Sequence, residues 1–201
     1  FSHFNVYRAN FFSHNQAGVA VMFAHHVTML NNVFTFNRGS SSYGLLIKEL
    51  QYSTIQGNRF LDNTVGLLVD GGSDLFIKHN EIKGNGWGMR LISASTNDTI
   101  CENNFLGNTF DMTTNVSYNR NIVNGNYWDK YEGYDLNKDG RGDVPFHPLS
   151  LFSMLAEQNE NVLFFFHSFL MDLLDSTEKL LPSITPDNYV DNHPYMKPIS
   201  I

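Results

Sequence analysis

A short pattern, Asn-x-Φ-x-x-Asn, in which Φ is aromatic or aliphatic, returns through the first 130 residues of the chain. Its leading asparagines are Asn10, Asn32, Asn58, Asn80, Asn103 and Asn126. They are spaced 22, 26, 22, 23 and 23 residues apart. A sequence period of roughly 20–50 residues is typical of solenoids, propellers and arrays, in which each unit buries its apolar face against its neighbours. The period therefore restricts the chain to a repeat architecture.

Each unit has the spacing of strands rather than of a helix. A second pattern, Gly-Φ-x-Φ, follows the closing asparagine, as in residues 18–21, 66–69 and 88–91. Apolar and polar residues alternate over two to four positions, which is strand spacing. A unit of about 22 residues has no room for a helix beside three such strands. The sequence predicts an all-β solenoid, a right-handed parallel β-helix with about 22 residues per coil, over residues 1–128.

One coil is longer than the others. The Gly-Φ-x-Φ of residues 44–47 arrives four residues late, which accounts for the spacing of 26. The extra residues lie among 38–42, a small polar run that we expect to bulge from one corner as a loop. The chain also begins inside a repeat and without a methionine. Because an open strand edge is a liability, we expect the chain to be the C-terminal part of a longer solenoid.

The repeat also predicts which side chains face inward. Coils stack about 4.8 Å apart, so equivalent residues of successive coils lie above one another. The predicted internal stack is Phe12, Phe34, Phe60, Ile82, Phe105 and Trp128. The asparagines should form amide ladders at corners, where their tolerance of left-handed backbone is useful. The predicted outward column is Ala20, Leu46, Leu68, Arg90 and Thr113. This register requires Phe60 to be buried and Arg90 to lie outside.

Composition narrows the classes of partner. The net charge is −7 and basic residues do not cluster, which argues against nucleic acid as the main partner. No stretch has the length of a membrane span or the form of a signal peptide. The single cysteine, Cys101, cannot form an intrachain disulfide. Its position in the repeat predicts an outward-facing thiol, either inert or, in an electropositive site, reactive.

Residues 129–148 form an Asp- and Gly-rich segment with the spacing of a calcium loop. Asp135, Asn137, Asp139 and Asp143 supply side-chain oxygens on alternate residues, and Arg141 could add its backbone carbonyl. Such oxygens, with Gly140 at the sharp turn, suit a hard cation such as Ca²⁺. The closing glutamate of an EF-hand is missing, because its position is occupied by a phenylalanine. The alternative is an Asx-rich loop held by its own hydrogen bonds.

Residues 149–201 are predicted to hold helices and a proline-rich tail. A short helix is expected over residues 149–155, after Pro148, and a second over about 161–181, ending at Pro182. Apolar residues of the second segment recur at three-, four- and seven-residue spacings. The helices either cap the open end of the solenoid or dock into a groove of a partner protein. Residues 191–198 are expected to be extended.

Histidine and methionine gather in the first coils. Imidazole and thioether groups are ligands for copper, and the candidate ligands are Met22, His25, His26 and Met29. Neighbouring residues on a strand point to opposite faces, so His25 and His26 should not easily chelate one ion together. The alternative is a set of scattered surface residues, which also covers His3 and His14.

The C-terminal third resembles the NosD family. The resemblance rests on residues 125–128 (Gly-Asn-Tyr-Trp), 131–135, 140–146 and 191–196. Residues 148–152, 172–175 and 181–182 also fit it, whereas residues 1–123 match the generic repeat shared by carbohydrate-binding and sugar-hydrolase β-helix proteins.

That resemblance implies a periplasmic accessory protein that works with the membrane and ATPase subunits of an ABC transporter. It implies support for assembly of the copper–sulfide cluster of nitrous oxide reductase, with a copper chaperone as a further partner. Such a protein is a docking and transfer platform rather than an enzyme, and any copper it holds is transient.

A polysaccharide lyase, epimerase or hydrolase on the same fold is the alternative function. Those enzymes need carboxylates, or a carboxylate and a base, converging on one lateral face. The outward column holds one charge, and Asp62 and Asp70 have no predicted partner one coil away. The outward column instead begins as a modest apolar stripe that suits protein contact. A carbohydrate-binding surface protein is a further alternative, but it would need an exposed aromatic row, and the predicted aromatic column faces inward.

Overall fold

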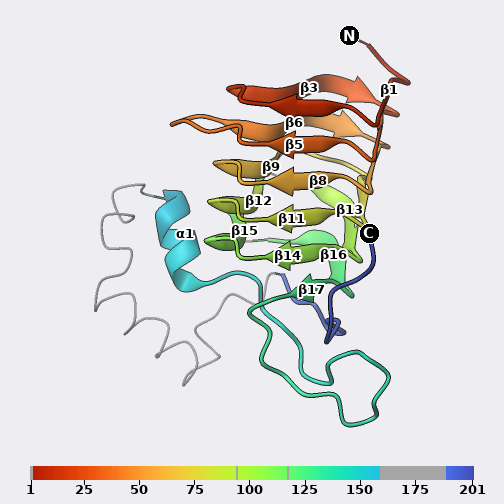
Figure 1. Ribbon diagram of the computed structural model, residues 1–201, viewed down its shortest axis with the longest axis vertical. Helices are drawn as coiled ribbons and strands as arrows, with labels where there is room; N and C mark the ends of the chain where they lie inside the picture. Colours follow the sequence, from red (N-terminus) through yellow and green to blue (C-terminus); the bar gives the residue numbers. More distant parts are fainter. Residues whose placement is uncertain (1, 94, 117, 159–188) are drawn as a thin grey trace.

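The computed structural model describes residues 2–93, 95–116, 118–158 and 189–201. The described residues up to Trp128 fold into a stack of flat coils (Figure 1). The coils make about five turns of about 23 residues each, and all strand pairs between coils are parallel. The predicted parallel β-helix is therefore confirmed. Within the described residues, no helix has the length and apolar character needed to cross a membrane.

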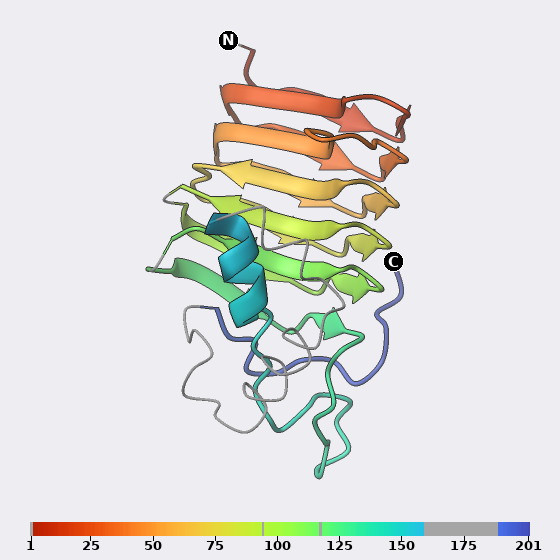
Figure 2. The same ribbon diagram turned by 90° about the vertical axis from the view of Figure 1, so that its left-hand side faces the viewer.

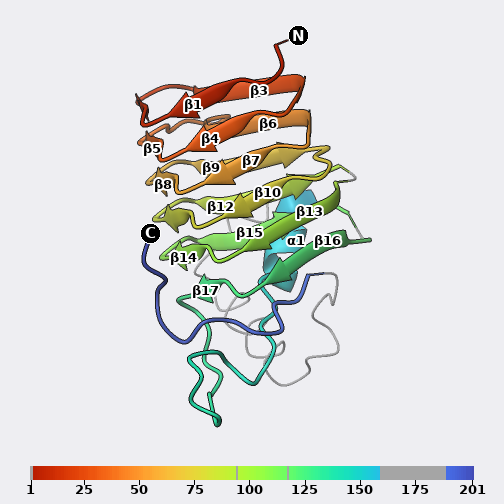
Figure 3. The same ribbon diagram turned by 90° about the vertical axis from the view of Figure 1, so that its right-hand side faces the viewer.

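Three parallel sheets form the sides of the solenoid (Figures 1 and 3). The first contains β1 (Val6–Arg8), β4 (Thr28–Leu30), β7 (Thr54–Gln56), β10 (Phe76–Lys78), β13 (Thr96–Cys101) and β16 (Arg120–Asn124). The second contains β2 (Phe11–Ser13), β5 (Val33–Thr35), β8 (Arg59–Leu61), β11 (Glu81–Lys83), β14 (Asn104–Leu106) and β17 (Tyr127–Trp128). The third contains β3 (Ala17–His25), β6 (Tyr43–Gln51), β9 (Val65–Asp70), β12 (Trp87–Ile92) and β15 (Phe110–Thr114).

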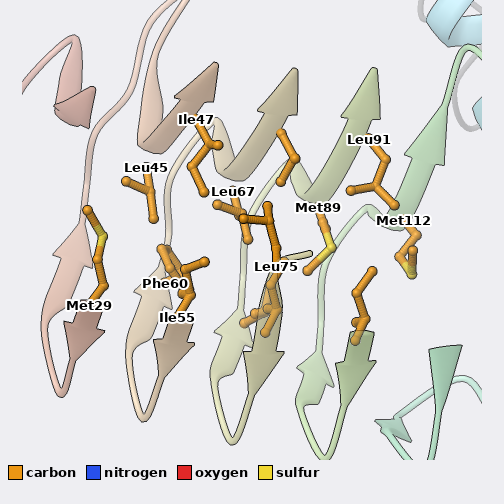
Figure 4. Packing of buried hydrophobic residues seen from close by; sticks show 14 of the residues in the cluster. Met29, Leu45, Ile47, Ile55, Phe60, Leu67, Leu75, Met89, Leu91 and Met112 are labelled. Atoms are coloured by element: carbon orange, nitrogen blue, oxygen red, sulfur yellow. The ribbon is translucent and has the colours of Figure 1, made fainter. Parts of the chain in front are cut away.

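The interior follows the predicted register. Phe34 pairs with Phe60 in the next coil, their rings stack 4.9 Å apart, and both side chains are fully buried. Farther along the same column, Phe105 stacks on Trp128 at 4.2 Å. Figure 4 shows further apolar side chains of successive coils meeting in the space between the sheets. One continuous apolar column thus runs the length of the described solenoid.

Two asparagine ladders run parallel to that column, as predicted. In the first, Asn58 Nδ2 donates to Asn80 Oδ1 (3.1 Å), and Asn80 Nδ2 donates to Asn103 Oδ1 (2.9 Å). From Asn32 onward, each ladder side chain also accepts a backbone N–H from the coil before it, as Asn80 does from the amide of Asn58 (2.9 Å). The second ladder runs from Asn15 to Asn108. These buried amides are therefore satisfied almost entirely by one another and by the backbone.

The left-handed backbone lies one residue earlier than the sequence analysis placed it. Among the residues immediately before ladder asparagines, Asn31 has φ 54°, Asp62 has 55° and Glu102 has 55°, whereas the ladder asparagines have negative φ. The extended backbone of the asparagine lets its side chain reach the next coil, so the sharp bend falls on its predecessor.

The glycine of Gly-Φ-x-Φ is required by the close approach of adjacent coils. A Cβ on Gly66 would lie 2.7 Å from the carbonyl oxygen of Gly88, and a Cβ on Gly88 would lie 2.7 Å from that of Asp111. Carbon and oxygen do not approach so closely without displacement of the backbone, which explains the glycine column.

The single described helix, α1 (Leu151–Gln158), lies against the side of the solenoid and not over its end (Figure 2). Phe152 packs on Phe110 of β15 at 5.9 Å, and Glu157 forms an ion pair with Arg90 of β12 at 2.7 Å. The predicted outward column is confirmed at Arg90, which is aligned with Leu68, meets α1 outside the sheet and keeps a fifth of its side chain exposed. Helix α1 therefore covers the C-terminal half of this column rather than capping the core. The predicted helix over 161–181 lies outside the described residues.

The C-terminal end of the core is closed by loop and tail segments. Trp128 and Tyr189 are 1% exposed, and Asp191 is fully buried. The Asp191 carboxylate accepts hydrogen bonds from the amides of Gly125 (2.7 Å) and Asn126 (2.8 Å). It also accepts from Asn126 Nδ2 (3.2 Å) and from the indole N–H of Trp128 (3.0 Å). Asp191 thus ends the first asparagine ladder from more than 60 residues away in sequence.

Candidate functional site

The prediction that Met29 is a copper ligand is wrong. Met29 is 1% exposed, pairs with Ile55 of the next coil, and belongs to the apolar interior (Figure 4). Its position in the unit is the inward one, three residues before the leading asparagine, so its thioether cannot reach solvent. Met22, another candidate copper ligand, lies on β3 and is 43% exposed.

His25 and His26 meet, contrary to the expectation that they point apart. Their Nδ1 atoms are 2.9 Å apart and their rings are nearly perpendicular. The reason is the backbone: His26 has φ 56°, so the chain leaves the extended conformation at this corner and the alternation of a strand no longer applies. Two imidazole nitrogens therefore converge at an exposed corner of the second described coil.

His3 completes this group from the coil before. Its ring is stacked on His25 with centroids 3.8 Å apart, and its Nδ1 accepts the backbone N–H of His25 (3.3 Å). Desolvation lowers the pKa of His25, and the neighbouring His3 and His26 imidazoles lower it further. The neutral imidazole, which is the form that binds metals, is favoured as a result.

Across the described part of the chain, no three side chains of His, Cys, Asp or Glu converge as a complete metal site. The His25–His26 pair therefore offers two nitrogens and leaves the remaining coordination positions to other groups.

An exposed aromatic row lies beside the histidines. Phe4 is 70% exposed and stacks on His26 at 4.8 Å, while Tyr52 is 56% exposed and lies 5.5 Å from His26. The expectation that the aromatic residues face only inward is thus incomplete. The left-handed corner residues of three successive coils, Phe4, His26 and Tyr52, form a second aromatic column outside.

In the Asp-rich segment, the predicted oxygens lie close together but bind the loop's own amides. The Asp135 carboxylate accepts from the N–H groups of Lys138 (2.6 Å) and Gly140 (2.9 Å). Asp139 Oδ1 accepts from the Arg141 amide (2.8 Å), and Asp143 Oδ2 accepts from that of Leu136 (2.6 Å). Asn137 Oδ1 accepts the Asp139 amide (2.9 Å). This is the hydrogen bonding expected of an Asx-rich loop, and calcium binding stays a prediction.

The Arg141 side chain points away from that loop. Its Nη2 donates to the Tyr195 hydroxyl (2.9 Å), and its guanidinium lies 4.4 Å from the centre of the Tyr195 ring. Arg141 therefore joins the loop to the C-terminal tail.

Cys101 occupies its predicted outward position, aligned with Lys78 of the coil before. Partial burial raises the pKa of its thiol, the Glu102 carboxylate raises it further, and Lys78 opposes them. A raised pKa disfavours the reactive thiolate, which supports the inert alternative.

Two acidic residues do have partners one coil away, which corrects the sequence analysis. Asp70 lies 3.6 Å from Lys48, and Asp62 lies 3.7 Å from Arg38. Both are ion pairs between half-exposed groups, and they lie on different edges of the solenoid. Such pairs contribute at most about 1 kcal/mol, and neither brings two carboxylates together as a glycosidase requires.

A family model described as "Periplasmic copper-binding protein (NosD)" matches residues 1–133. The chain belongs to the NosD family. The predicted NosD resemblance is thereby confirmed. The match lies mainly over the coils, including those that carry His25 and His26, which the sequence analysis assigned only to the generic repeat. The family description names a binding protein rather than an enzyme.

Two NosD proteins are similar to this chain. One, from Pseudomonas aeruginosa, is named "Probable ABC transporter binding protein NosD" and is 30% identical over 173 residues. One of the same name from Stutzerimonas stutzeri is 29% identical over 174 residues. Each comparison covers 78% of this chain and 40% of the relative. The chain thus spans about two fifths of the length of the relatives it matches.

Sequence reasoning missed two residues of these sites. His3 was grouped with scattered surface histidines, although its distance of 22 residues from His25 is one coil spacing. That spacing would have revealed the stacking. No comparable signal existed for Asp191, because it lies in the tail, outside the repeat.

Proposed function

We propose that this chain is the copper-handling and docking part of a non-catalytic accessory protein in the periplasm. It docks on the membrane subunit of an ABC transporter and passes copper toward the copper–sulfide cluster of nitrous oxide reductase. The convergence of the His25 and His26 nitrogens at an exposed corner carries this proposal. Family membership and the names of the relatives support it, and the copper chaperone and the ATPase subunit are its further partners.

His25 and His26 are the residues that bind the copper ion. Two metal–nitrogen bonds of about 2 Å at a tetrahedral angle place the nitrogens roughly 3.3 Å apart, so the two rings need to separate by only a few tenths of an ångström from their present 2.9 Å. The proton between the two Nδ1 atoms would move through solvent to Nε2 of the same ring as the ion enters, so both imidazoles stay neutral. Imidazole suits copper, and the exposed thioether of Met22 is a further soft ligand near the same end of β3.

Replacing the pair by His25→Gln and His26→Asn is expected to weaken Cu(I) binding at least about tenfold, because loss of a ligand costs no less than loss of an outer-shell contact. Asparagine tolerates the left-handed backbone at position 26, so the corner should survive. Competition with a chromophoric Cu(I) chelator measures the affinity.

The matched control is His79→Asn, another left-handed corner histidine, at φ 49°. It should leave Cu(I) affinity unchanged. Equal copper affinity of the double variant and the unaltered protein would rule out the His25–His26 site.

Docking is assigned to the face of α1 that points away from the solenoid. Leu155 is 42% exposed there, while Phe152 and Ala156 face the sheet. In the full-length protein, Leu155→Glu is expected to weaken binding to the detergent-solubilised transporter membrane subunit by at least about tenfold, as buried interface anchors do. Surface plasmon resonance measures it.

Leu136→Glu is the control, since Leu136 is 77% exposed in the Asp-rich loop. If both variants bind like the unaltered protein, α1 is not the docking element. If neither they nor the parent bind, the transporter role is wrong.

A further inference from the structure

The longest coil carries a cleft at the corner where its extra residues lie. In this coil the glycine of Gly-Φ-x-Φ, Gly44, follows the closing Asn37 by four residues more than in the neighbouring coils. Beneath this loop lies a cleft of about 600 Å³, within the usual range for small-ligand sites. It is lined by His14, Asn15, Gln16, Phe36 and residues 38–42.

Two side chains of this cleft occupy backbone positions that favour glycine. His14 has φ 58° and Phe36 has φ 52°, and the corresponding corner residues of later coils are Asp62, Gly84 and Gly107. The fold therefore accepts glycine at this corner. Left-handed corners recur along the whole solenoid, as at Asn31 and Glu102, so the backbone angle alone does not mark a site. At this corner the left-handed backbone carries two large rings beside the cleft.

The His14 and Phe36 side chains form an ordered platform. The His14 and Phe36 rings stack 5.7 Å apart, and the Arg38 guanidinium lies 5.2 Å from the centre of the Phe36 ring. Nδ1 of His14 is engaged by the Ser13 hydroxyl, so Nε2 is the nitrogen left for a ligand. Phe36 is 43% exposed and offers an apolar surface beside these polar groups.

A hydrogen bond to the backbone fixes the orientation of the Arg38 side chain. Its Nε donates to the carbonyl of Asp62 (2.8 Å), which uses one of five N–H donors. Its Nη2 lies 3.7 Å from the Asp62 carboxylate, which is outside hydrogen-bond distance. A guanidinium fork held in this way matches a carboxylate geometrically. The lining of this cleft carries an arginine and no carboxylate. The Asp62 carboxylate that pairs with Arg38 lies outside the lining, and solvent screens this pair because both side chains are about half exposed.

We propose that this cleft binds a small organic carboxylate. The acid group meets Arg38, with further donors from Gln16 and the serine hydroxyls, and the carbon skeleton lies on Phe36. This site is separate from the His25–His26 corner and does not depend on copper or on the transporter.

Titration with benzoate, followed by ¹H–¹⁵N NMR of the chain, tests the proposal. Saturable shifts are expected at the Arg38 Nε–H and at the amides of residues 38–42. Benzamide, the neutral isostere, should not bind, because it lacks the charge that Arg38 recognises. Inorganic phosphate tests whether charge alone suffices, and binding of phosphate as tight as that of benzoate would overturn the role of Phe36.

Arg38→Gln should weaken benzoate binding at least about tenfold, as expected for loss of a charge-assisted pair. Arg120→Gln, at an arginine that lies over Tyr118 elsewhere, should bind like the parent. Phe36→Gly should also lose binding while staying folded, since glycine adopts the left-handed backbone at this corner, and its Tm is measured to check this. Unsaturable shifts, or unchanged affinity in Arg38→Gln, would refute the site.

Discussion

Replacing Asp191 by alanine is expected to destabilise the protein by about 3–5 kcal/mol, the largest single effect we predict. The carboxylate is fully buried and receives the N–H groups of Gly125, Asn126 and Trp128, besides the Asn126 side-chain amide. Alanine would leave these buried donors without a partner, and each such loss costs about 1–3 kcal/mol. Urea denaturation measures the change in unfolding free energy.

Asp191→Asn keeps the size of the side chain and removes its charge and one of its two acceptor oxygens. Both carboxylate oxygens accept hydrogen bonds, Oδ1 from Gly125 and Oδ2 from Trp128, so an amide must turn its NH₂ toward a donor. We expect this variant to lose about 1–3 kcal/mol despite its matching size. Asp143→Ala is the control, because Asp143 accepts one exposed loop amide and should cost less. An Asp191→Asn protein as stable as the parent would contradict the proposed end of the ladder.

Asp98→Asn is expected to stabilise the protein at pH 8 and to have little effect at pH 4. Asp98 is 1% exposed. Its Oδ1 accepts the Leu75 amide (2.9 Å), and its Oδ2 has no hydrogen bond of good geometry among the described residues. Burial raises the pKa of Asp98 from 3.8 to about 6. The Leu75 amide lowers this pKa, the Asp74 carboxylate raises it, and the Ser95 hydroxyl lowers it slightly.

The direction of the pH dependence follows from proton uptake. Between pH 4 and 6 the folded state holds a proton on Asp98 that the unfolded state has released, so stability falls as pH rises through this window. A pKa raised from 3.8 to about 6 corresponds to roughly 3 kcal/mol lost by pH 8. Asparagine stays neutral, and its oxygen can still accept from Leu75, as the ladder asparagines do. We therefore expect a gain of about 1–3 kcal/mol at pH 8.

Urea denaturation of both proteins from pH 4 to pH 8 measures this difference. Asp139→Asn, at an exposed aspartate, should show no comparable pH-dependent gain. A constant difference between Asp98→Asn and the parent across the range would show that Asp98 does not titrate in the folded state as described.

Much of the fold could be predicted because the repeat imposes the same environment on every coil. One register explains Phe34, Phe60 and Phe105 together, since parallel coils place equivalent residues above one another. The outward place of Arg90 and the asparagine ladders follow from that register as well. The copper candidates were less predictable, because periodicity says which way Met29 faces but not what a corner does to two neighbouring histidines.

The sequence by itself determined the coil, its length, its interior and its family. Tertiary structure alone decided what happens where the repeat is broken. The left-handed backbone at His26 turns its ring toward His25. Helix α1 packs against the side of the solenoid through contacts with Arg90 and Phe110. Asp191 returns from the tail to end the ladder. The first depends on a local backbone angle, and the other two depend on contacts between segments with no fixed spacing; a sequence period encodes neither.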